Sequence, residues 1–238
     1  LVALEHEGLV GLGEAHAVPY VGEDREAIRR ALESLGGALD GDPAAVETTL
    51  GALPPQVSRS QAAVAALDMA LHDLVGQQAG LPLWRLFRLD PAATPVTSFT
   101  IGLDSLETMQ AHVREAAHYP ILKIKLGTDH DLAILEAVRA VTDKPLRVDA
   151  NAAWTVDDAI ERLRAIEPFG IQFVEQPIPR GDVDGLRRVR DAVAIPIFAD
   201  ESSVGPEDIE PLAGAVDGVN VKLMKCGGLA RARRMIAL

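Results

Sequence analysis

The sequence predicts an α/β protein in which a (β/α)-barrel domain follows a smaller α+β domain. Two observations predict the barrel. A unit of short apolar strand, polar loop and amphipathic helix repeats from Thr94 onward, and each strand after the first ends in a charged residue. The smaller domain is predicted by a hairpin pattern and two helical patterns in the first part of the chain. We therefore expect one domain over residues 1–93 and the barrel domain over residues 94–238.

The smaller domain begins with two short apolar segments around a Glu-Gly pair. Leu1–His6 and Leu9–Gly13 flank this pair, and the arrangement predicts an antiparallel hairpin. Helices are expected over Asp24–Leu39, which is amphipathic, and over Ser58–Ala79, which carries an alanine-rich apolar stripe. The sequence opens inside a strand and not at a methionine, so we expect the natural N-terminus to lie upstream.

The repeat after Thr94 consists of six strands with helical segments between them. The expected strands are Val96–Ile101, Ile121–Lys125, Leu146–Asp149, Gln172–Glu175, Ile195–Ala199 and Gly218–Lys222. The expected helices are Ser105–Ala117, His130–Val141, Val156–Ile166, Val183–Val193 and Pro206–Leu212. Strands joined by helical crossovers run parallel, and strands without polar alternation are covered on both faces.

The charged strand ends decide between two parallel architectures. These charged residues are Lys125, Asp149, Glu175, Asp200 and Lys222. Successive members are 24, 26, 25 and 22 residues apart in the sequence. A charge at the end of a buried strand is costly unless it has a role there. In a (β/α)₈ barrel successive strand ends converge on the face that carries the active site, whereas an open doubly wound sheet would spread them along a line. The pattern favours the barrel.

Six units fall short of a complete barrel. Eight units would need about 200 residues after Thr94, and fewer follow it. We therefore expect a C-terminally incomplete barrel.

Composition excludes several classes of partner. The formal net charge is −12, so the protein should repel nucleic-acid backbones and anionic lipid surfaces. No apolar run approaches the roughly 20 residues that span a bilayer. Cys226 is the single cysteine, which excludes an internal disulfide and fits a reducing cytoplasm. We expect a cytoplasmic homo-oligomer without membrane or nucleic-acid partners.

Three of the strand-end charges are candidate metal ligands. Asp149, Glu175 and Asp200 stand on consecutive strands at matched spacing. Carboxylate oxygens suit Mg²⁺, and three converging carboxylates would repel one another without a cation. In the competing interpretation each of them is a residue at the barrel rim that forms a salt bridge. That interpretation is reasonable for one such residue but does not explain three at matched spacing.

The lysines predict acid–base chemistry. Lys123 and Lys125 share one face of their strand, so each disfavours protonation of the other, and one pKa should fall towards that of a useful base. Lys222 ends the sixth strand, which lies across an eight-stranded ring from the second. Two bases on opposite sides of a metal-bound carboxylate could remove a proton from the α-carbon on one side and return it on the other, through a metal-stabilised enediolate.

As a set, these residues resemble the muconate-lactonizing subgroup of the enolase superfamily. The matching segments are Lys123-Ile-Lys125, Val148-Asp-Ala-Asn151, Val174-Glu-Gln-Pro177, Ala199-Asp-Glu-Ser202 and Asn220-Val-Lys222. The resemblance implies an enolase-superfamily barrel with an N-terminal capping domain and one Mg²⁺ ion. It implies that Asp149, Glu175 and Asp200 bind the metal, that Lys125 and Lys222 form the acid–base pair, and that Lys123 contacts the substrate carboxylate and lowers the pKa of Lys125.

Within that subgroup the chain looks most like a dipeptide epimerase of the L-Ala-D/L-Glu type. Ser98–Ser105 is similar to the segment in which a threonine contacts substrate, which assigns Thr100, and Tyr20 in a capping-domain loop is a candidate for the specificity pocket. Lys225 competes with Lys222 as second base, but Lys222 is preferred because Lys225 falls beyond the expected strand end and reads as a solvated or outer residue.

The expected substrate is a small carboxylate, either a dipeptide or an N-acyl amino acid. Muconate cycloisomerase and N-succinylamino acid racemase or o-succinylbenzoate synthase remain alternatives with the same metal and lysines. A Schiff-base aldolase is a third class, against which the three carboxylates argue. An inactive fragment or a metal-binding scaffold is the non-enzymatic alternative.

Overall fold

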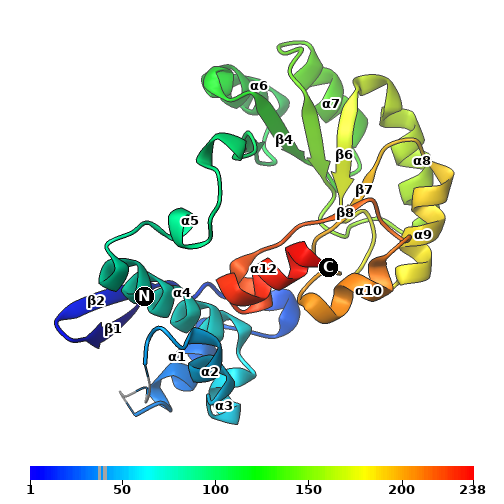
Figure 1. Ribbon diagram of the computed structural model, residues 1–238. Coiled ribbons are helices and arrows are strands. Elements are labelled where there is room, and N and C mark those ends of the chain that lie inside the picture. Colours follow the sequence, from blue (N-terminus) through cyan, green and yellow to red (C-terminus); the bar gives the residue numbers. More distant parts are fainter. Residues whose placement is uncertain (37–38, 40–41) are drawn as a thin grey trace. The chain divides into compact units, whose positions relative to one another are not determined.

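The computed structural model describes residues 1–36, 39 and 42–238, and these form two compact units (Figure 1). The first unit comprises Leu1–Thr94, Val204–Ile209 and Val221–Leu238, and the second comprises Pro95–Ser203 and Glu210–Asn220. The segments 204–209 and 221–238 make their contacts with the first unit, although both follow the strand repeat in the sequence. The expected domains, 1–93 and 94–238, stay a prediction.

The first unit opens with the predicted hairpin. Strands β1 (Val2–His6) and β2 (Leu9–Gly13) pair antiparallel, with His6 opposite Leu9. Helix α4 (Gln61–Ala79) packs directly against β2, and a Cβ added at Gly13 would come within 1.8 Å of a carbonyl oxygen of that helix. Gly11 and Gly13 of β2, neither of which has space for a Cβ, therefore allow strand and helix to touch.

Short helices complete the first unit. They are η1 (Pro19–Val21), α1 (Arg25–Glu33), α2 (Val46–Gly51), α3 (Pro55–Ser58), α5 (Leu83–Leu86), η2 (Pro91–Ala93), η5 (Pro206–Asp208), α11 (Leu223–Cys226) and α12 (Leu229–Ala237). Helix α1 begins where predicted, with the Asp24 side chain accepting the Ala27 N–H, but it ends at Glu33. Part of the helix expected up to Leu39, residues 37 and 38, lies outside the described residues.

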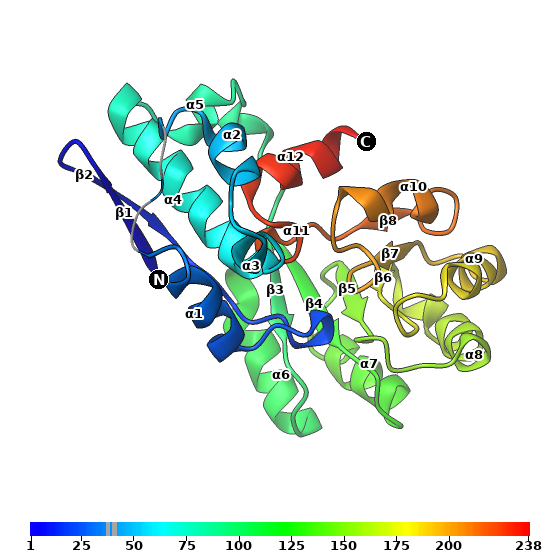
Figure 2. The same cartoon turned by 90° about the horizontal axis from the view of Figure 1, so that it is seen from below.

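The second unit is a six-stranded parallel sheet in sequential order. Its strands are β3 (Ser98–Ile101), β4 (Ile121–Lys125), β5 (Leu146–Asp149), β6 (Ile171–Glu175), β7 (Ile197–Ala199) and β8 (Gly218–Val219). The helices are α6 (Leu106–Glu115), η3 (Ala116–His118), α7 (Asp131–Arg139), α8 (Val156–Ile166), η4 (Glu167–Phe169) and α9 (Val183–Ala192), with α10 (Ile209–Leu212) before β8. Figures 1 and 2 show α6 to α9 along one side of the sheet.

Strand alternation sorts the side chains of this sheet onto two faces. Leu122, Ile124 and Val148 are fully buried and belong to one apolar core with residues of α6 to α9. Successive strand residues point to opposite faces, so Lys123, Lys125 and their neighbours lie on the face away from those helices. The polar site is therefore built on the inner face of a sheet whose outer face supplies the core.

One strand end differs from the prediction. Strand β7 ends at Ala199 as predicted, with Asp200 directly after it, but Lys222 does not end β8, which stops at Val219. Lys222 instead immediately precedes α11, and its carbonyl accepts the N–H groups of Lys225 and Cys226 as the backbone turns there into a helix. The strand-end placement of Lys222 is wrong.

Across the described part of the chain, every helix is too short or too polar to cross a lipid bilayer.

Candidate active site

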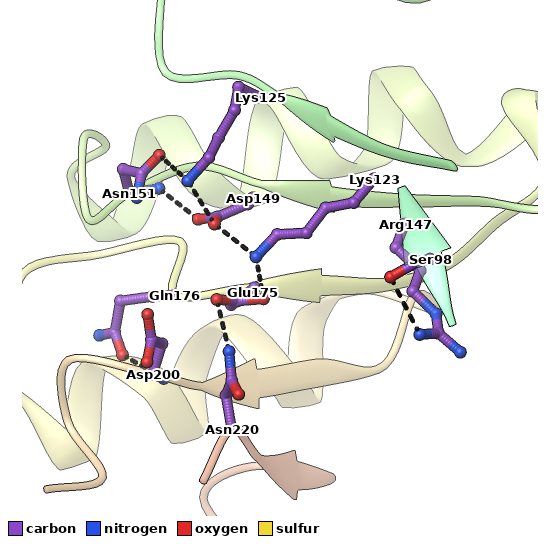
Figure 3. A network of polar contacts seen from close by, with 10 residues as sticks. All are labelled: Ser98, Lys123, Lys125, Arg147, Asp149, Asn151, Glu175, Gln176, Asp200 and Asn220. Carbon is purple, nitrogen blue, oxygen red and sulfur yellow. Dashed lines mark hydrogen bonds and ion pairs between the residues drawn. The ribbon is translucent and has the colours of Figure 1, made fainter. Parts of the chain in front are cut away.

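The site is centred on three adjacent strand ends in the second unit. Lys125 is the ladder partner of Asp149, and Asp149 is the partner of Glu175. Partners in neighbouring parallel strands point to the same face, so these side chains meet (Figure 3). The carboxyl groups of Asp149 and Glu175 are only 1% and 3% exposed.

The Lys123 ammonium bridges the two buried carboxylates. Its Nζ lies 2.8 Å from Asp149 Oδ2 and 2.6 Å from Glu175 Oε2. Burial alone would lower the pKa of Lys123, but the charges and hydrogen bonds of Glu175 and Asp149 outweigh burial and raise it. The raised pKa favours the charged form of Lys123, and the pKa expected to fall in the lysine pair is not that of Lys123.

Lys125 lies at the outer end of the same strand and also contacts Asp149. Its Nζ donates to Asp149 Oδ2 at 2.8 Å and to Asn151 Oδ1 at 2.9 Å. Burial would raise the pKa of Asp149, but hydrogen bonds and charge from Lys123 and Lys125 lower it. Asp149 is consequently held as a carboxylate between two ammonium groups.

The pKa of Glu175 shifts in the opposite direction to that of Asp149. Burial raises its pKa, the nearby Asp149 charge raises it further, and Asp200 adds to this against the opposing effect of Lys123. The Asn220 amide donates to Glu175 Oε1 at 2.9 Å. The charges of both Asp149 and Asp200 therefore act on Glu175 and disfavour its ionised form.

Gln176 organises the loops beyond the strand ends. Its side-chain oxygen accepts the Asp200 and Ser202 N–H groups at 2.9 and 3.0 Å, and its amide nitrogen donates to the Ile178 carbonyl and the Ser202 hydroxyl. The residue is fully buried and adopts a positive φ of 38°, a conformation that is uncommon outside glycine. Gln176 thereby fixes the backbone from which the Asp200 side chain projects.

The loop after β5 crosses to the end of β6. Asn151 and Ala152 both have positive φ, at 48° and 60°, and the Ala152 N–H donates to the Gln176 carbonyl at 2.8 Å. The Asn151 N–H donates to Asp149 Oδ1 at 3.0 Å, so this turn also satisfies the second carboxylate oxygen of Asp149. Asn151 and Gln176 flank the acids in the sequence as possible partners of the metal ligands, and the structure gives both defined hydrogen-bond partners.

Asn220 is a site residue that the sequence motif contained without a role. It follows β8 by one residue, and its own N–H donates to the Ala199 carbonyl at 2.7 Å, which aims its amide at Glu175. Its place two residues before Lys222 in the matching segment was the available signal.

The donor set can be compared with the needs of Mg²⁺. Among the described residues, no three His, Cys, Asp or Glu side chains stand close enough together to hold a metal ion, and Lys123 Nζ lies between two of the expected ligands. The chemistry nevertheless fits, because the donors are buried carboxylate oxygens, and both Asp149 and Asp200 raise the pKa of Glu175. Such mutual repulsion is relieved by a divalent cation.

The remaining predicted site residues lie in different places. Thr100 is exposed on β3 as the ladder partner of Lys123. Tyr20 lies in η1 of the first unit and is 37% exposed, and Lys222 immediately precedes α11 of the same unit. Lys225 is fully buried, so its interpretation as a solvated residue is wrong, and the preference for Lys222 loses its argument from the strand end.

Comparison with known proteins places the chain in a family. Residues 1–87 match the model of the mandelate racemase/muconate lactonizing enzyme N-terminal domain, and residues 107–238 match the model described as enolase C-terminal domain-like. The chain belongs to the mandelate racemase/muconate lactonizing enzyme family of the enolase superfamily. The predicted family and fold class are thereby confirmed.

Three relatives show where in this family the chain lies. The L-Ala-D/L-Glu epimerase of Bacteroides thetaiotaomicron is 39% identical over all of this chain and 62% of its own length. The L-Lys-D/L-Arg epimerase of Methylococcus capsulatus is 40% identical over 98% of this chain and 68% of its own length. The crystal structure of a dipeptide epimerase from Enterococcus faecalis, complexed with Mg and the dipeptide L-Leu-L-Tyr, is 37% identical with a TM-score of 0.91, covering 98% of this chain and 69% of that one. The chain thus spans between three fifths and three quarters of their lengths.

Proposed function

We propose that this protein takes part in the Mg²⁺-dependent epimerisation of dipeptides, by removal and return of the proton on the carbon next to the dipeptide carboxylate. The observation that carries the proposal is the Lys123, Lys125, Asp149 and Glu175 cluster, in which buried acids and two lysines meet at adjacent strand ends. The relatives named as epimerases, and the Enterococcus structure with Mg and a dipeptide, support the dipeptide as the substrate.

The metal role falls to Asp149, Glu175 and Asp200. When bound there, Mg²⁺ supplies positive charge that stabilises the negative charge developing on the substrate carboxylate. Gln176 holds the backbone at Asp200, and Asn220 donates to Glu175, so each of these two residues orients one ligand.

The acid–base role falls to Lys125 and Lys222, one for each face of the α-carbon. One lysine, as the neutral amine, takes the α-proton and becomes an ammonium group. The other, already an ammonium group, donates its own proton to the opposite face of the enediolate, and this inverts the α-carbon. Lys123 is partly buried and its raised pKa favours the charged form, so it can hold the substrate carboxylate and stabilise the enediolate by hydrogen bonding. Thr100 and Tyr20 complete the proposal as substrate-contacting residues, and a homo-oligomeric state stays a prediction.

The test is solvent exchange at the α-carbon. The protein is incubated with Mg²⁺ and a library of L,L-dipeptides in D₂O, and products are analysed by mass spectrometry and chiral chromatography. We expect deuterium at one α-carbon together with the epimerised dipeptide. Lys125→Ala should lower the rate of epimerisation at least about a hundredfold, which is the usual effect of losing a general base.

Two outcomes would overturn the proposal. Exchange only in N-acyl amino acids would point to a racemase of that substrate class, and conversion of a muconate lactone would point to a cycloisomerase. Circular dichroism of Lys125→Ala guards against loss of fold as the cause of inactivity.

A further inference from the structure

Asp68 has a fully buried side chain, and two of its hydrogen-bond partners lie far away in the sequence. It sits in the middle of α4, and its Oδ2 accepts the N–H of Leu229, 161 residues further along. Its Oδ1 accepts the N–H of Ala230 at 3.3 Å. A buried charge is expensive unless donors satisfy it, so these backbone groups are what makes Asp68 tolerable at this position.

These two N–H groups belong to the first turn of α12. The first N–H groups of a helix have no partner within the helix, and a Ser, Thr, Asp or Asn side chain at its start normally accepts them. Here the residue at the start is Gly228, which has no side chain to offer. Helix α12 is therefore capped from another helix, by an aspartate side chain at the positive end of the helix.

The two residues before α12 are glycines, and the contact between this turn and α4 depends on them. Gly227 and Gly228 have φ values of +91° and +106°. A Cβ added at Gly228 would lie 2.5 Å from the Asp68 Cβ, and one at Gly227 would lie 2.7 Å from the side-chain oxygen of Gln61. Only glycines let this turn adopt its backbone conformation and lie against α4 at the same time.

The same turn is hydrogen-bonded to the segment that begins at Lys222. The N–H groups of Gly227 and Gly228 donate to the Leu223 carbonyl at 3.0 and 2.9 Å. The Lys222 carbonyl accepts the N–H groups of Lys225 and Cys226 at 2.9 and 3.1 Å. The backbone of Lys222 is thus connected through one short helix to the turn that Asp68 holds.

We infer that Asp68 is a positioning residue: from α4 it fixes segment 222–230, and with it the backbone that presents Lys222. The part of this inference that concerns catalysis rests on the proposed function, since it takes Lys222 as one of the two bases. His72 closes the arrangement, because its Nδ1 lies 3.3 Å from Asp68 Oδ2 and 2.9 Å from the Asp68 carbonyl oxygen.

Cys226 provides a test that does not depend on activity. It is the single cysteine, it is fully buried, and it lies inside segment 222–230. In Asp68→Asn the side-chain NH₂ group faces one of the two backbone N–H groups of Leu229 and Ala230. Since both are donors, that hydrogen bond is lost. We expect native-state labelling of Cys226 by a thiol reagent to become roughly tenfold faster, the factor associated with losing one helix cap.

Asp73→Asn is the matched control. Asp73 lies on the same helix, and its carboxylate accepts the Leu12 N–H at 2.9 Å, so this change disturbs the hairpin and not α12. Gly228→Ala approaches the contact from the other side and replaces Asp68→Asn if that variant does not fold. Cys226 labelling that stays at the wild-type rate in both Asp68→Asn and Gly228→Ala, or that rises equally in Asp73→Asn, would overturn the inference.

Catalysis gives a second, directional readout. In the proposed mechanism Lys125 removes the α-proton from one epimer of the dipeptide and Lys222 removes it from the other. Displacement of Lys222 then leaves intact the solvent exchange of the epimer from which Lys125 removes the proton. Asp68→Asn should then slow α-deuterium exchange of one epimer at least about tenfold more than that of the other. Equal loss for both epimers contradicts a positioning role for Lys222. A wild-type protein that exchanges neither epimer overturns the proposed function, while the Cys226 comparison still decides whether Asp68 holds the segment.

Discussion

Lys123 illustrates how far residue types alone can be taken. Two lysines on one strand face predicted a lowered pKa for one of the pair, and the resemblance assigned it to Lys125. The pKa of Lys123 is raised, because two buried carboxylates contact its Nζ. The sequence contained both acids, but it did not tell that Lys123 would contact both of them. Lys–carboxylate pairing depends on the ladder register, which places Asp149 beside Glu175.

Gln176 gives the first prediction at this scale. Gln176→Ala removes the acceptor of the Asp200 and Ser202 N–H groups, leaving buried donors without a partner. We expect Mg²⁺ affinity to fall by about 10- to 100-fold, as for outer residues that orient metal ligands. Isothermal titration calorimetry with Mg²⁺ measures this.

Gln172→Ala on the same strand is the control for that change. The Gln172 side-chain oxygen accepts from Arg147 Nε at 3.1 Å, and Figure 3 shows Arg147 reaching towards Ser98 and not towards the carboxylates. An equal loss of Mg²⁺ affinity in both variants would mean that general destabilisation, and not the orientation of Asp200, is the cause.

His72 gives a prediction about pH. Burial lowers the pKa of His72, but the hydrogen bond and charge of Asp68 outweigh burial, and the pKa is raised above 6.5. A group whose pKa is higher in the folded state binds protons more tightly there. Its stabilising contribution is fully present below about pH 6.5 and is lost as pH rises through the folded pKa.

The measurement is urea unfolding of the wild type and of His72→Gln across pH 5.5 to 8.5. We expect the difference in free energy of unfolding between the two proteins to be largest at the acidic end and to shrink as pH rises. A difference that grows with pH would show that His72 is bound in its neutral form.

At the scale of elements, arginines near the ends of successive helices form a pattern that the sequence did not disclose. Arg139 of α7 donates to the Phe169 carbonyl, Arg164 of α8 donates to the Ala192 carbonyl, and Arg190 of α9 donates to the Gly214 carbonyl. Each guanidinium thus donates a hydrogen bond at the C-terminal end of the next helical segment, where unpaired carbonyl groups make positive charge favourable. The spacing of these arginines follows the βα repeat, as does that of the strand-end charges.

Arg139 is the strongest case for a stability measurement. It is partly buried, and besides the Phe169 carbonyl it donates to the Lys144 carbonyl at 2.6 Å. We expect Arg139→Ala to lower the free energy of unfolding by about 1.5–3 kcal/mol, the range for hydrogen bonds to charged groups. Arg188→Ala is the matched change, because its ion pair with Asp157 is exposed and should contribute little.

Local pattern predicted the regular elements better than their ends. Strands β4 and β5 and helix α8 span the predicted residues, since each is a strong apolar run or a capped amphipathic segment. Strand β8 is shorter than predicted, because the backbone at Lys222 turns into α11 through hydrogen bonds that apolar pattern does not encode. Boundaries set by such contacts follow from tertiary structure.

At the scale of the whole molecule, the chain order and the compact units do not coincide. The first unit is assembled from three separate segments, and the last of them, 221–238, follows the entire strand repeat. Composition and repeat spacing predicted a single boundary near residue 93. The contact that ties residue 68 to residue 229 spans most of the sequence, and no local signal marks it.

This organisation predicts how the first unit behaves when divided. A fragment of residues 1–94 retains α4 but loses the two N–H groups that satisfy Asp68, so its buried carboxylate keeps only His72. We expect the fragment to be poorly folded alone and to gain helical circular dichroism when a synthetic peptide of residues 221–238 is added. The same peptide should bind an Asp68→Asn fragment roughly tenfold more weakly, as for the loss of one helix cap. A fragment that melts cooperatively without the peptide, and is unchanged by it, would show that the hairpin and α4 form a self-sufficient domain and that segment 221–238 is only attached to it.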